Sequence, residues 1–325
     1  MEHLYQDERN WSRLCPELLQ LICKNLPDIA DFANFRAVCK DWRAAIPSSD
    51  YAHREPCLIY YHPYKGARFY VLTSTHWIEL KSPCYKEKWF QGLSQGYILI
   101  RDEKTKAYNL LNPINGKEIR LPLLAGPYYN LLDVELDEGV PKYVAVCEFD
   151  GRASSMPRIC QIGDEKWTTV NLYASMRYTF YKPSSSVNSG CCTHGKDTDV
   201  KPSVAKRKLI TLPESYKLCR PCGNANNLLG VKCSSYKDMS FEIYVLDDGN
   251  GDTKWIRTNN IGDQVVFWGN WNCFCWKTHS SSIYKRNSVY FRSFKLFGRF
   301  DIGKGTTEIL QTPPKGDRWF CPSQV

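Results

Sequence analysis

The sequence predicts an α+β chain of two parts: a small three-helix unit at residues 1–50 and an all-β, propeller-like domain at residues 51–325. Apolar residues recur at helical spacing only in the first part. After residue 50 they gather in strand-length aromatic and β-branched runs bounded by Gly, Pro, Asn or Asp. Loosely repeated strand–turn–strand units in this second part favour a propeller.

The first helix is predicted by apolar residues that share one helical face: Leu14, Leu18, Leu21, Ile22 and Leu26. Pro16 fits the first turn, where its missing N–H costs nothing, and Pro27 ends the helix. Three short helices bury little surface, so a unit of this size usually needs a partner surface to be stable.

Asp28 can cap a second helix, whose predicted buried face consists of Ile29, Phe32, Phe35 and Val38. A third helix is predicted from about Cys39 to Ile46, with Trp42 pointing inward. Pro47-Ser48-Ser49 ends it.

Two motifs in this unit, Leu14-x-Pro16-Glu17-Leu18-Leu19 and Val38-Cys39-Lys40-x-Trp42-Arg43, together resemble the F-box. The resemblance implies docking on a Skp-type adaptor, which connects the chain to a cullin and a RING subunit of a ubiquitin ligase. The adaptor contacts it implies are Leu14, Pro16, Leu18, Ile22, Leu26, Val38, Cys39 and Trp42. Cys15 departs from the family, which usually has proline directly after the leucine, and we expect this to weaken the contact at most.

The predicted strands of the second part include residues 57–61, 69–72, 97–100, 143–146, 241–246, 265–268 and 288–291. The repeated units cover residues 109–122, 159–167, 243–255 and 298–309. Asn115-Gly116 suits a hairpin turn, because both residues tolerate positive φ. Neither a Trp-Asp nor a Gly-Gly blade pattern is present, so these are not typical WD or kelch repeats.

The order of short motifs over residues 57–310 is similar to a large plant family of F-box proteins with a propeller-like C-terminal domain. The motifs are Trp89-Phe90, Gly92–Tyr97, Leu111–Pro113, Ile119–Pro122, Phe241–Leu246, Lys254-Trp255, Ile261–Asp263, Val266-Phe267 and Asn287–Phe291. Residues 181–208 depart from the pattern and are predicted to be a polar loop or a degenerate blade.

Composition restricts the class of protein. Without a signal peptide or an apolar run of membrane-spanning length, we expect the chain in the nucleus or cytoplasm. Most of its 15 cysteines are therefore expected to be thiols. Residues 1–50 carry a charge of −2, and the rest carries 37 Lys and Arg against 26 Asp and Glu, or +11. A basic surface can favour nucleic acid, anionic membranes or acidic protein partners, but scattered lysines more often only solvate a surface. We therefore expect a protein target and neither a membrane nor a nucleic-acid partner.

Several patterns could carry chemistry, and each has a simpler interpretation. Gly92–Gly96 matches a nucleophile elbow around Ser94, but a strand follows where a helix is required, so we expect a tight turn that enters a strand. Gly298–Lys304 approaches a phosphate loop but lacks its hydroxyl residue and helix. Lys206–Lys208 could be a nuclear-import signal but suits a solvated loop. Trp268, Trp271 and Trp276 could form a ligand platform but suit a core.

The cysteines also offer possible metal ligands. Cys219-x-x-Cys222 has zinc spacing, with possible partners Cys273, Cys275 or His279, and Cys191, Cys192 and His194 form a looser cluster. Core and strand positions explain them better. We therefore predict no catalytic residue, cofactor or metal.

The predicted function is that of a substrate-recognition subunit of a Skp–cullin–F-box ubiquitin ligase, which binds the adaptor through residues 1–50 and an unknown target through the β domain. One alternative is a basic β-domain module that binds nucleic acid or protein without a ligase role. Another is an F-box protein that binds the adaptor without promoting degradation, or a decayed family member.

Overall fold

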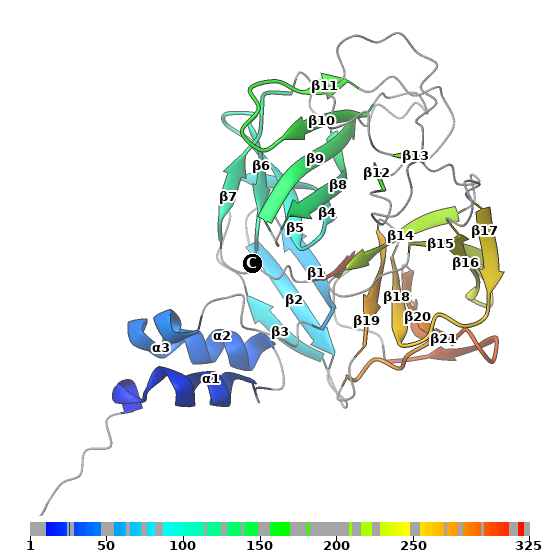
Figure 1. Ribbon diagram of the computed structural model, residues 1–325, viewed down its shortest axis with the longest axis horizontal. Helices are drawn as coiled ribbons and strands as arrows, with labels where there is room; N and C mark the ends of the chain where they lie inside the picture. The colour runs from blue at the N-terminus through cyan, green and yellow to red at the C-terminus, as the bar shows by residue number, and fades with distance from the viewer. Residues whose placement is uncertain are drawn as a thin grey trace, which may run out of the picture. The chain divides into compact units, whose positions relative to one another are not determined.

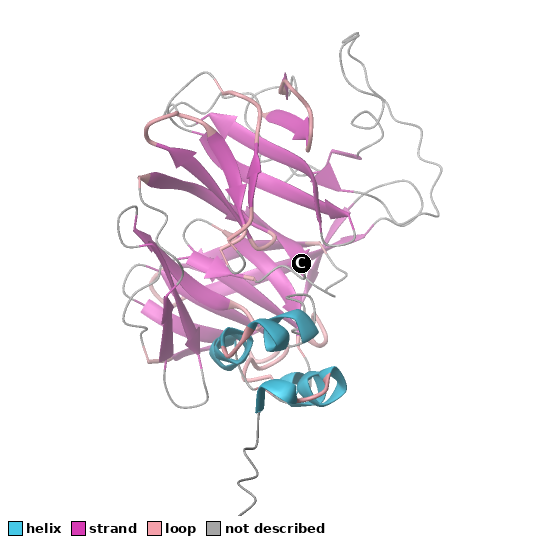
Figure 2. Ribbon diagram, turned by 90° about the vertical axis from the view of Figure 1, so that its left-hand side faces the viewer, coloured by secondary structure: helices cyan, strands magenta, loops and turns pink. Residues whose placement is uncertain are grey.

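The structure is a computed structural model of the chain (Figure 1). It describes residues 11–24, 26, 29–46, 55–62, 66–72, 77–81, 87–113, 116–124, 129–137, 140–148, 157–169, 180–181, 208–209, 216–222, 228–247, 254–269, 272–278, 282–293, 296–311 and 318–321. The chain divides into two compact units, one ending at Glu55 and the other comprising Pro56–Ser323. In the described residues, helices occur only in the first unit, and the second consists of strands and loops (Figure 2).

The first unit contains the three expected helices, preceded by a short 3-10 turn, η1 (Trp11–Arg13). The helices are α1 (Pro16–Lys24), α2 (Ile29–Ala37) and α3 (Lys40–Ala45). Pro16 is the first residue of α1, as its lost N–H predicts, and the first α-helical bond runs from Leu19 N to Cys15 O at 3.2 Å. Pro27 and Asp28, expected to end α1 and to cap α2, lie outside the described residues.

The interior of this unit is aromatic. Phe32, Phe35 and Trp42 are buried, and the rings of Phe35 and Trp42 are 4.4 Å apart. Trp42 also donates through its indole Nε1 to the carbonyl of Trp11 at 3.0 Å, which ties α3 to the chain before α1. The prediction that Trp42 points inward is therefore correct.

In its described residues, the second unit contains three sheets of four strands. One has the order β23 (Arg318–Phe320), β1 (Cys57–His62), β2 (Gly66–Leu72), β3 (Trp77–Lys81). The next has β4 (Lys88–Ser94), β5 (Tyr97–Asp102), β6 (Tyr108–Leu111), β7 (Glu118–Arg120). The third has β11 (Thr168–Thr169), β10 (Arg158–Gln161), β9 (Val140–Glu148), β8 (Tyr129–Asp137).

A fourth sheet has nine strands and consists of two blade-like halves. One half is β17 (Lys254–Thr258), β16 (Ser240–Asp247), β15 (Leu229–Ser235) and β14 (Tyr216–Cys222). The other is β19 (Cys273–Lys277), β18 (Gln264–Gly269), β20 (Ser288–Ser293), β21 (Leu296–Asp301) and β22 (Thr306–Ile309). The parallel pair β14–β19 joins them. The predicted strands at residues 57–61, 69–72, 97–100, 143–146, 241–246, 265–268 and 288–291 all lie within observed strands.

The last described strand belongs to the same sheet as the first. Strand β23 pairs antiparallel with β1, so the last described strand completes the first sheet. Trp319 of β23 is fully buried and donates from Nε1 to the carbonyl of Trp268 at 3.1 Å. This pairing thus joins Cys57–Ile59 to Arg318–Phe320, at opposite ends of the unit's sequence.

The segment at 181–208 begins and ends in a short antiparallel pair, β12 (Phe180–Tyr181) with β13 (Lys208–Leu209). The residues between them, 182–207, lie outside the described residues. The predicted loop or degenerate blade, the Cys191, Cys192 and His194 cluster, and most of the Lys206–Lys208 motif therefore fall outside the description.

Aromatic and branched side chains fill the spaces between sheets. One buried cluster joins β5 and β6 to β8 and β9 and includes Tyr97, Tyr108, Tyr129 and Val144. A second brings Phe267, Tyr284, Tyr290 and Trp319 together around edge-to-face ring contacts. Trp268 and Trp276 are buried in such clusters, so they act as core residues; Trp271 lies outside the described residues.

Four of the cysteines differ from the expectation of thiols. Cys219 of β14 is joined to Cys273 of β19, and Cys222 of β14 is joined to Cys321, which follows β23. The other eight described cysteines are not in disulfides, so the expectation for the majority holds in the described residues. These pairs could not be predicted from the sequence, because the two cysteines of each pair are 54 and 99 residues apart.

Candidate functional site

Helix α1 is apolar on two sides, and only one is covered. Leu19 and Cys23, four residues apart, are 1% and 4% exposed. Leu18, Leu21 and Ile22 are 47%, 59% and 40% exposed, and their i, i+3, i+4 spacing places them together on another face of the helix. We call these three residues the α1 surface. An uncovered apolar face on so short a helix is typical of an interaction site.

The α1 surface belongs to a unit with its own interior and caps. Cys39 is the N-cap of α3, and its Sγ accepts a hydrogen bond from Trp42 N at 3.4 Å. Arg43 Nε donates to the carbonyl of Arg36 at 3.2 Å, which links α3 to α2. These contacts hold the helices together without using the α1 surface.

The predicted adaptor contacts do not all lie at the surface. Pro16, Leu18, Ile22 and Val38 are exposed, Leu14 and Leu26 are half-buried, Cys39 is a half-buried cap, and Trp42 is 8% exposed. Trp42 therefore supports the helices from inside. The prediction that Val38 belongs to the buried face of the second helix is wrong. Helix α2 ends at Ala37, so Val38 lies beyond the helix, and it is 57% exposed.

Leu21 is the residue that the contact set omitted. It lies three residues after Leu18, on the same face, and is the most exposed residue of the α1 surface. The helical spacing already contained this signal. Trp11, which is 63% exposed, carries no comparable pattern.

The second unit encloses a cavity of about 180 Å³ where segments distant in the sequence meet. Its walls include Ser94 and Gln95 of the β4–β5 hairpin, Arg220 of β14, Asn272 and Trp319. Gln95 Nε2 donates to the carbonyl of Pro221 at 3.1 Å, and Asn272 Nδ2 donates to the carbonyl of Trp319 at 2.5 Å. The walls are therefore fixed by hydrogen bonds between sheets.

A buried ion pair lies beside this cavity. Asp133 of β8, which is 5% exposed, pairs with the guanidinium of Arg220. Ser94 Oγ donates to Asp133 Oδ1 at 3.2 Å and accepts from Val134 N at 3.4 Å. Burial raises the pKa of the Asp133 carboxyl, and the Arg220 charge opposes that rise. This network joins β4, β8 and β14 near the centre of the unit.

Comparison with known proteins identifies both parts of the chain. Residues 11–53 match the F-box domain. Residues 69–312, three quarters of the chain, match the KIB1-4 beta-propeller. The chain belongs to the KIB1-4 beta-propeller family. An F-box/kelch-repeat protein of Arabidopsis thaliana is 50% identical over 38 residues, which are 12% of this chain and only 10% of that relative.

These matches confirm the resemblance to plant F-box proteins with a C-terminal propeller. An F-box implies, in general, a substrate adaptor of a Skp–cullin–F-box ubiquitin ligase, and such subunits are typically non-catalytic. In the described part of the chain, no helix has both the length and the hydrophobicity of a membrane span.

Ser94 of the KIB1-4 propeller is a turn residue that holds an ion pair. Gln95 and Gly96, with φ of 49° and 77°, turn the chain directly from β4 into β5, and no helix follows. Its hydroxyl is occupied by Asp133 and Val134 N. The expectation of a tight turn is confirmed, and the arrangement of a nucleophile elbow is absent at this hairpin.

The phosphate-loop pattern is also a strand and a turn. Gly298 lies within β21, and Gly303–Gly305 form the turn into β22. Lys304 N donates to Asp301 Oδ1 at 3.0 Å and Gly305 N donates to Asp301 O at 2.8 Å, so a carboxylate and a carbonyl already occupy the amides. Nothing here cradles a phosphate.

Gly298 is required for packing, which gives a testable prediction. A Cβ there would meet the ring of Phe291 and lie 2.6 Å from the Glu308 carbonyl oxygen. Gly298→Ala should lower the free energy of unfolding by about 1–3 kcal/mol because backbone and ring must move apart. Urea unfolding measures this. Gly305→Asn, at φ +67 with open space around it, is the control, and unchanged stability of Gly298→Ala would contradict the packing role.

The cysteine motif does not form a metal site in the described residues. Cys219 and Cys222 are each in a disulfide with a different partner, and no group of three or more His, Cys, Asp or Glu there could hold a metal ion. Cys275 is fully buried in the propeller core, where burial raises the pKa of its thiol. His279 lies outside the described residues.

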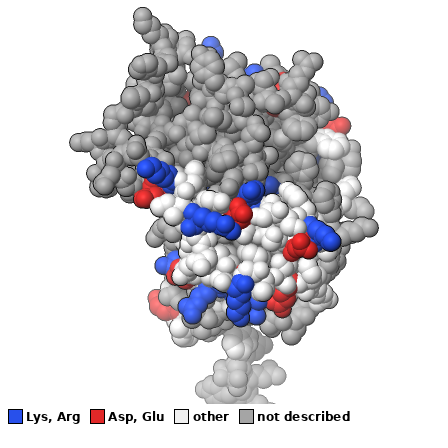
Figure 3. Space-filling model, turned by 90° about the vertical axis from the view of Figure 1, so that its right-hand side faces the viewer, with Lys and Arg blue, Asp and Glu red and all other residues white. Residues whose placement is uncertain are grey.

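Basic and acidic side chains are mixed on the outer face of the propeller shown in Figure 3. Glu242 lies 3.8 Å from both Lys232 Nζ and Arg257 Nη2, and Glu308 lies 2.8 Å from Arg299 Nη2. Nucleic-acid binding needs a continuous basic stripe. The described basic side chains that pair with carboxylates in this way do not form a continuous basic stripe.

Proposed function

We propose that this chain is the substrate-recognition subunit of a Skp–cullin–F-box ubiquitin ligase. In this proposal the F-box, at about residues 1–50, binds a Skp-type adaptor, and the propeller, residues 51–325, binds the protein to be ubiquitinated. The family matches support the general role. The observation that carries the specific proposal is the α1 surface, an apolar face left uncovered on a helix whose other face is buried.

The proposed adaptor contacts are the exposed residues Pro16, Leu18, Leu21, Ile22 and Val38, with Leu14 and Leu26 at the margin. Complete burial of a Leu or Ile side chain contributes about 1.5–3 kcal/mol, and the three residues of the α1 surface have roughly half of their surface still to bury. Trp42 and Cys39 support the surface from within by fixing α3.

The mechanism is positional. The chain binds the adaptor with one unit and the target with the other. It thereby holds the target's lysines near the ubiquitin-charged enzyme and raises their effective concentration. No residue of this chain forms or breaks a bond in this scheme. The chemistry belongs to the enzymes that the complex brings together.

The test is assembly of the complex from purified parts. The full chain, a Skp-type adaptor and a cullin are mixed and separated by size-exclusion chromatography. We expect one species containing all three, and we expect the cullin to separate from the chain when the adaptor is omitted. Elution of a folded chain apart from the adaptor would contradict the proposal and favour an independent β-domain module.

A further inference from the structure

A polar depression lies at one end of the β17–β22 half-sheets, where three loops meet. The loops are the β17–β18 connection at Asn259–Asp263, the segment Lys285–Asn287 before β20, and the β21–β22 turn at Ile302–Gly305. The depression has a volume of about 580 Å³, and Arg286 and Asn259 are among the residues that line it.

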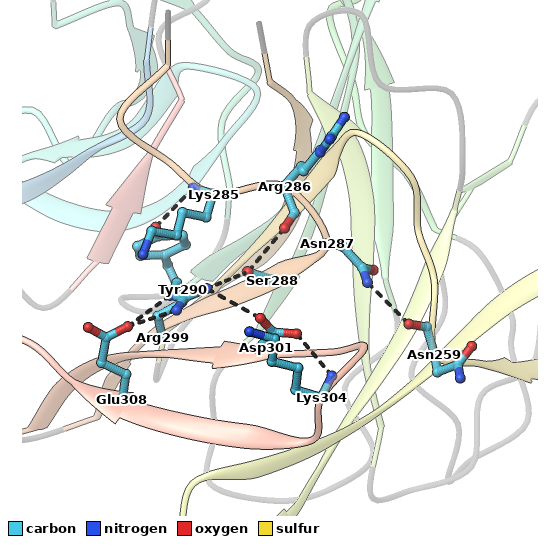
Figure 4. Close-up of polar contacts among 10 residues, drawn as sticks. All are labelled: Asn259, Lys285, Arg286, Asn287, Ser288, Tyr290, Arg299, Asp301, Lys304 and Glu308. Carbon is cyan, nitrogen blue, oxygen red and sulfur yellow. Dashed lines mark hydrogen bonds and ion pairs between the residues drawn. The ribbon is translucent and has the colours of Figure 1, made fainter. Parts of the chain in front are cut away.

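One residue fastens the three loops together. Asn287, at φ 53°, accepts from Ile261 N through Oδ1 at 2.9 Å and donates from Nδ2 to the Asn259 carbonyl at 3.2 Å (Figure 4). Its carbonyl accepts from Ile302 N at 3.1 Å. The depression is therefore formed before any partner arrives, which reduces the entropy lost on binding.

The acidic groups around the depression are already paired. Asp263 lies 3.5 Å from Lys277 Nζ. Asp301 accepts from Lys304 N and lies 3.6 Å from Arg299 Nη1, and Arg299 also donates twice to Glu308, at 3.2 and 2.8 Å. The guanidinium of Arg299 is thus bound by carboxylates of the same chain and is not available to a partner.

Cations of these loops remain available. Arg286 lines the depression, and Lys304 follows Gly303, another lining residue, in the β21–β22 turn. Both are exposed, and neither side chain makes a hydrogen bond or ion pair with any residue in the described part of the chain. Lys285, next to Arg286, is exposed as well. Figure 4 shows the Arg286 side chain pointing away from the paired groups. The Asn259 side chain is also exposed, and it offers an amide donor and acceptor on the wall of the depression that Arg286 also lines.

We propose that this depression binds an acidic segment of the target protein. Arg286 and Lys304 pair with its carboxylates, and Asn259 bonds to its backbone. The surplus of positive charge in the second part of the chain would steer such a segment toward the site. A few exposed cations near paired acids suit a short peptide better than a nucleic-acid backbone, which needs many phosphate contacts.

The proposal rests on the proposed function, because it names the class of target that the propeller recognises. In the test, the affinity of the full chain is measured by titration with a fluorescent glutamate-rich peptide. The same titration is made with a peptide that carries glutamine in place of glutamate. We expect the glutamate peptide to bind, the glutamine peptide not to bind, and Arg286→Glu/Lys304→Glu to weaken binding by about tenfold or more.

The matched control is Lys166→Glu/Lys254→Glu, which makes the same change of charge at exposed lysines away from the depression. It should keep nearly all of the binding. Arg286→Gln, which removes one charge without adding another, should weaken binding in the same direction and replaces the double variant should that fail to fold.

Three results would overturn the assignment: absence of binding to the wild-type chain, equal losses in the double variant and its control, or a single-stranded DNA that binds instead of the peptide and is lost with the same variant. Adaptor binding is measured on the same proteins. Its retention in Arg286→Glu/Lys304→Glu separates a failure of this site from a failure of the ligase role.

Discussion

Replacing Leu18 and Ile22 with aspartate is expected to weaken binding of a Skp-type adaptor by at least about 100-fold, because exposed apolar anchors contribute most of the affinity of a small interface. Both residues are on the α1 surface, and neither belongs to the buried face formed by Leu19 and Cys23. The double variant should therefore keep its helices and its thermal stability. Titration of the full chain with adaptor, beside circular dichroism, measures both quantities.

The control for this prediction is Asn34→Asp/Ala44→Asp, which adds the same charge at exposed positions of α2 and α3. Adaptor affinity close to that of the wild-type chain is expected. Equal losses in the two variants would mean that added negative charge, and not the α1 surface, decides binding. Leu19→Asp serves as the opposite reference, because a charge on the buried face should unfold the unit.

The second large effect is expected at the centre of the propeller. Asp133→Ala leaves the Arg220 guanidinium without its carboxylate and removes an acceptor from Ser94. Removing one member of a buried ion pair costs about 3–5 kcal/mol, so the propeller should unfold at clearly lower denaturant concentration. Chemical unfolding followed by tryptophan fluorescence measures the loss.

Strand β8 supplies its own control. Asp137 pairs with Lys142 at 2.5 Å, but both side chains are largely exposed. Asp137→Ala should cost less than about 1 kcal/mol, because water screens surface pairs. Similar small losses at the two positions would contradict a structural role for the buried network.

The pH dependence of this network has a definite sign. Burial raises the pKa of Asp133, so its carboxyl binds a proton more readily in the folded chain than in the unfolded chain. Stability from this group is complete below the unfolded pKa and declines as pH rises through the folded pKa. The penalty of Asp133→Ala should therefore shrink as pH rises through that range.

Local patterns made much of the fold predictable. The helical face from Leu14 to Leu26 and the run Ser288–Phe291 depend on neighbours in sequence, so periodicity and composition reveal them. The positive φ of Gln95 was harder to anticipate, but the tight turn at Gly96 was predicted.

Long-range pairs were not predictable. Asp133 and Arg220, the partners of Cys219 and Cys222, and the pairing of β23 with β1 join residues far apart, which one sequence does not reveal. Orientation was also hard to predict from the sequence: Trp42 was expected both to point inward and to contact the adaptor, and the structure shows that it is buried.

Isothermal titration of the full chain with a purified Skp-type adaptor tests the central claim most directly. We expect one adaptor per chain and a negative heat-capacity change, which is the mark of apolar burial, and we expect the Leu18→Asp/Ile22→Asp variant to lose both. Absence of binding to a correctly folded wild-type chain would contradict the account.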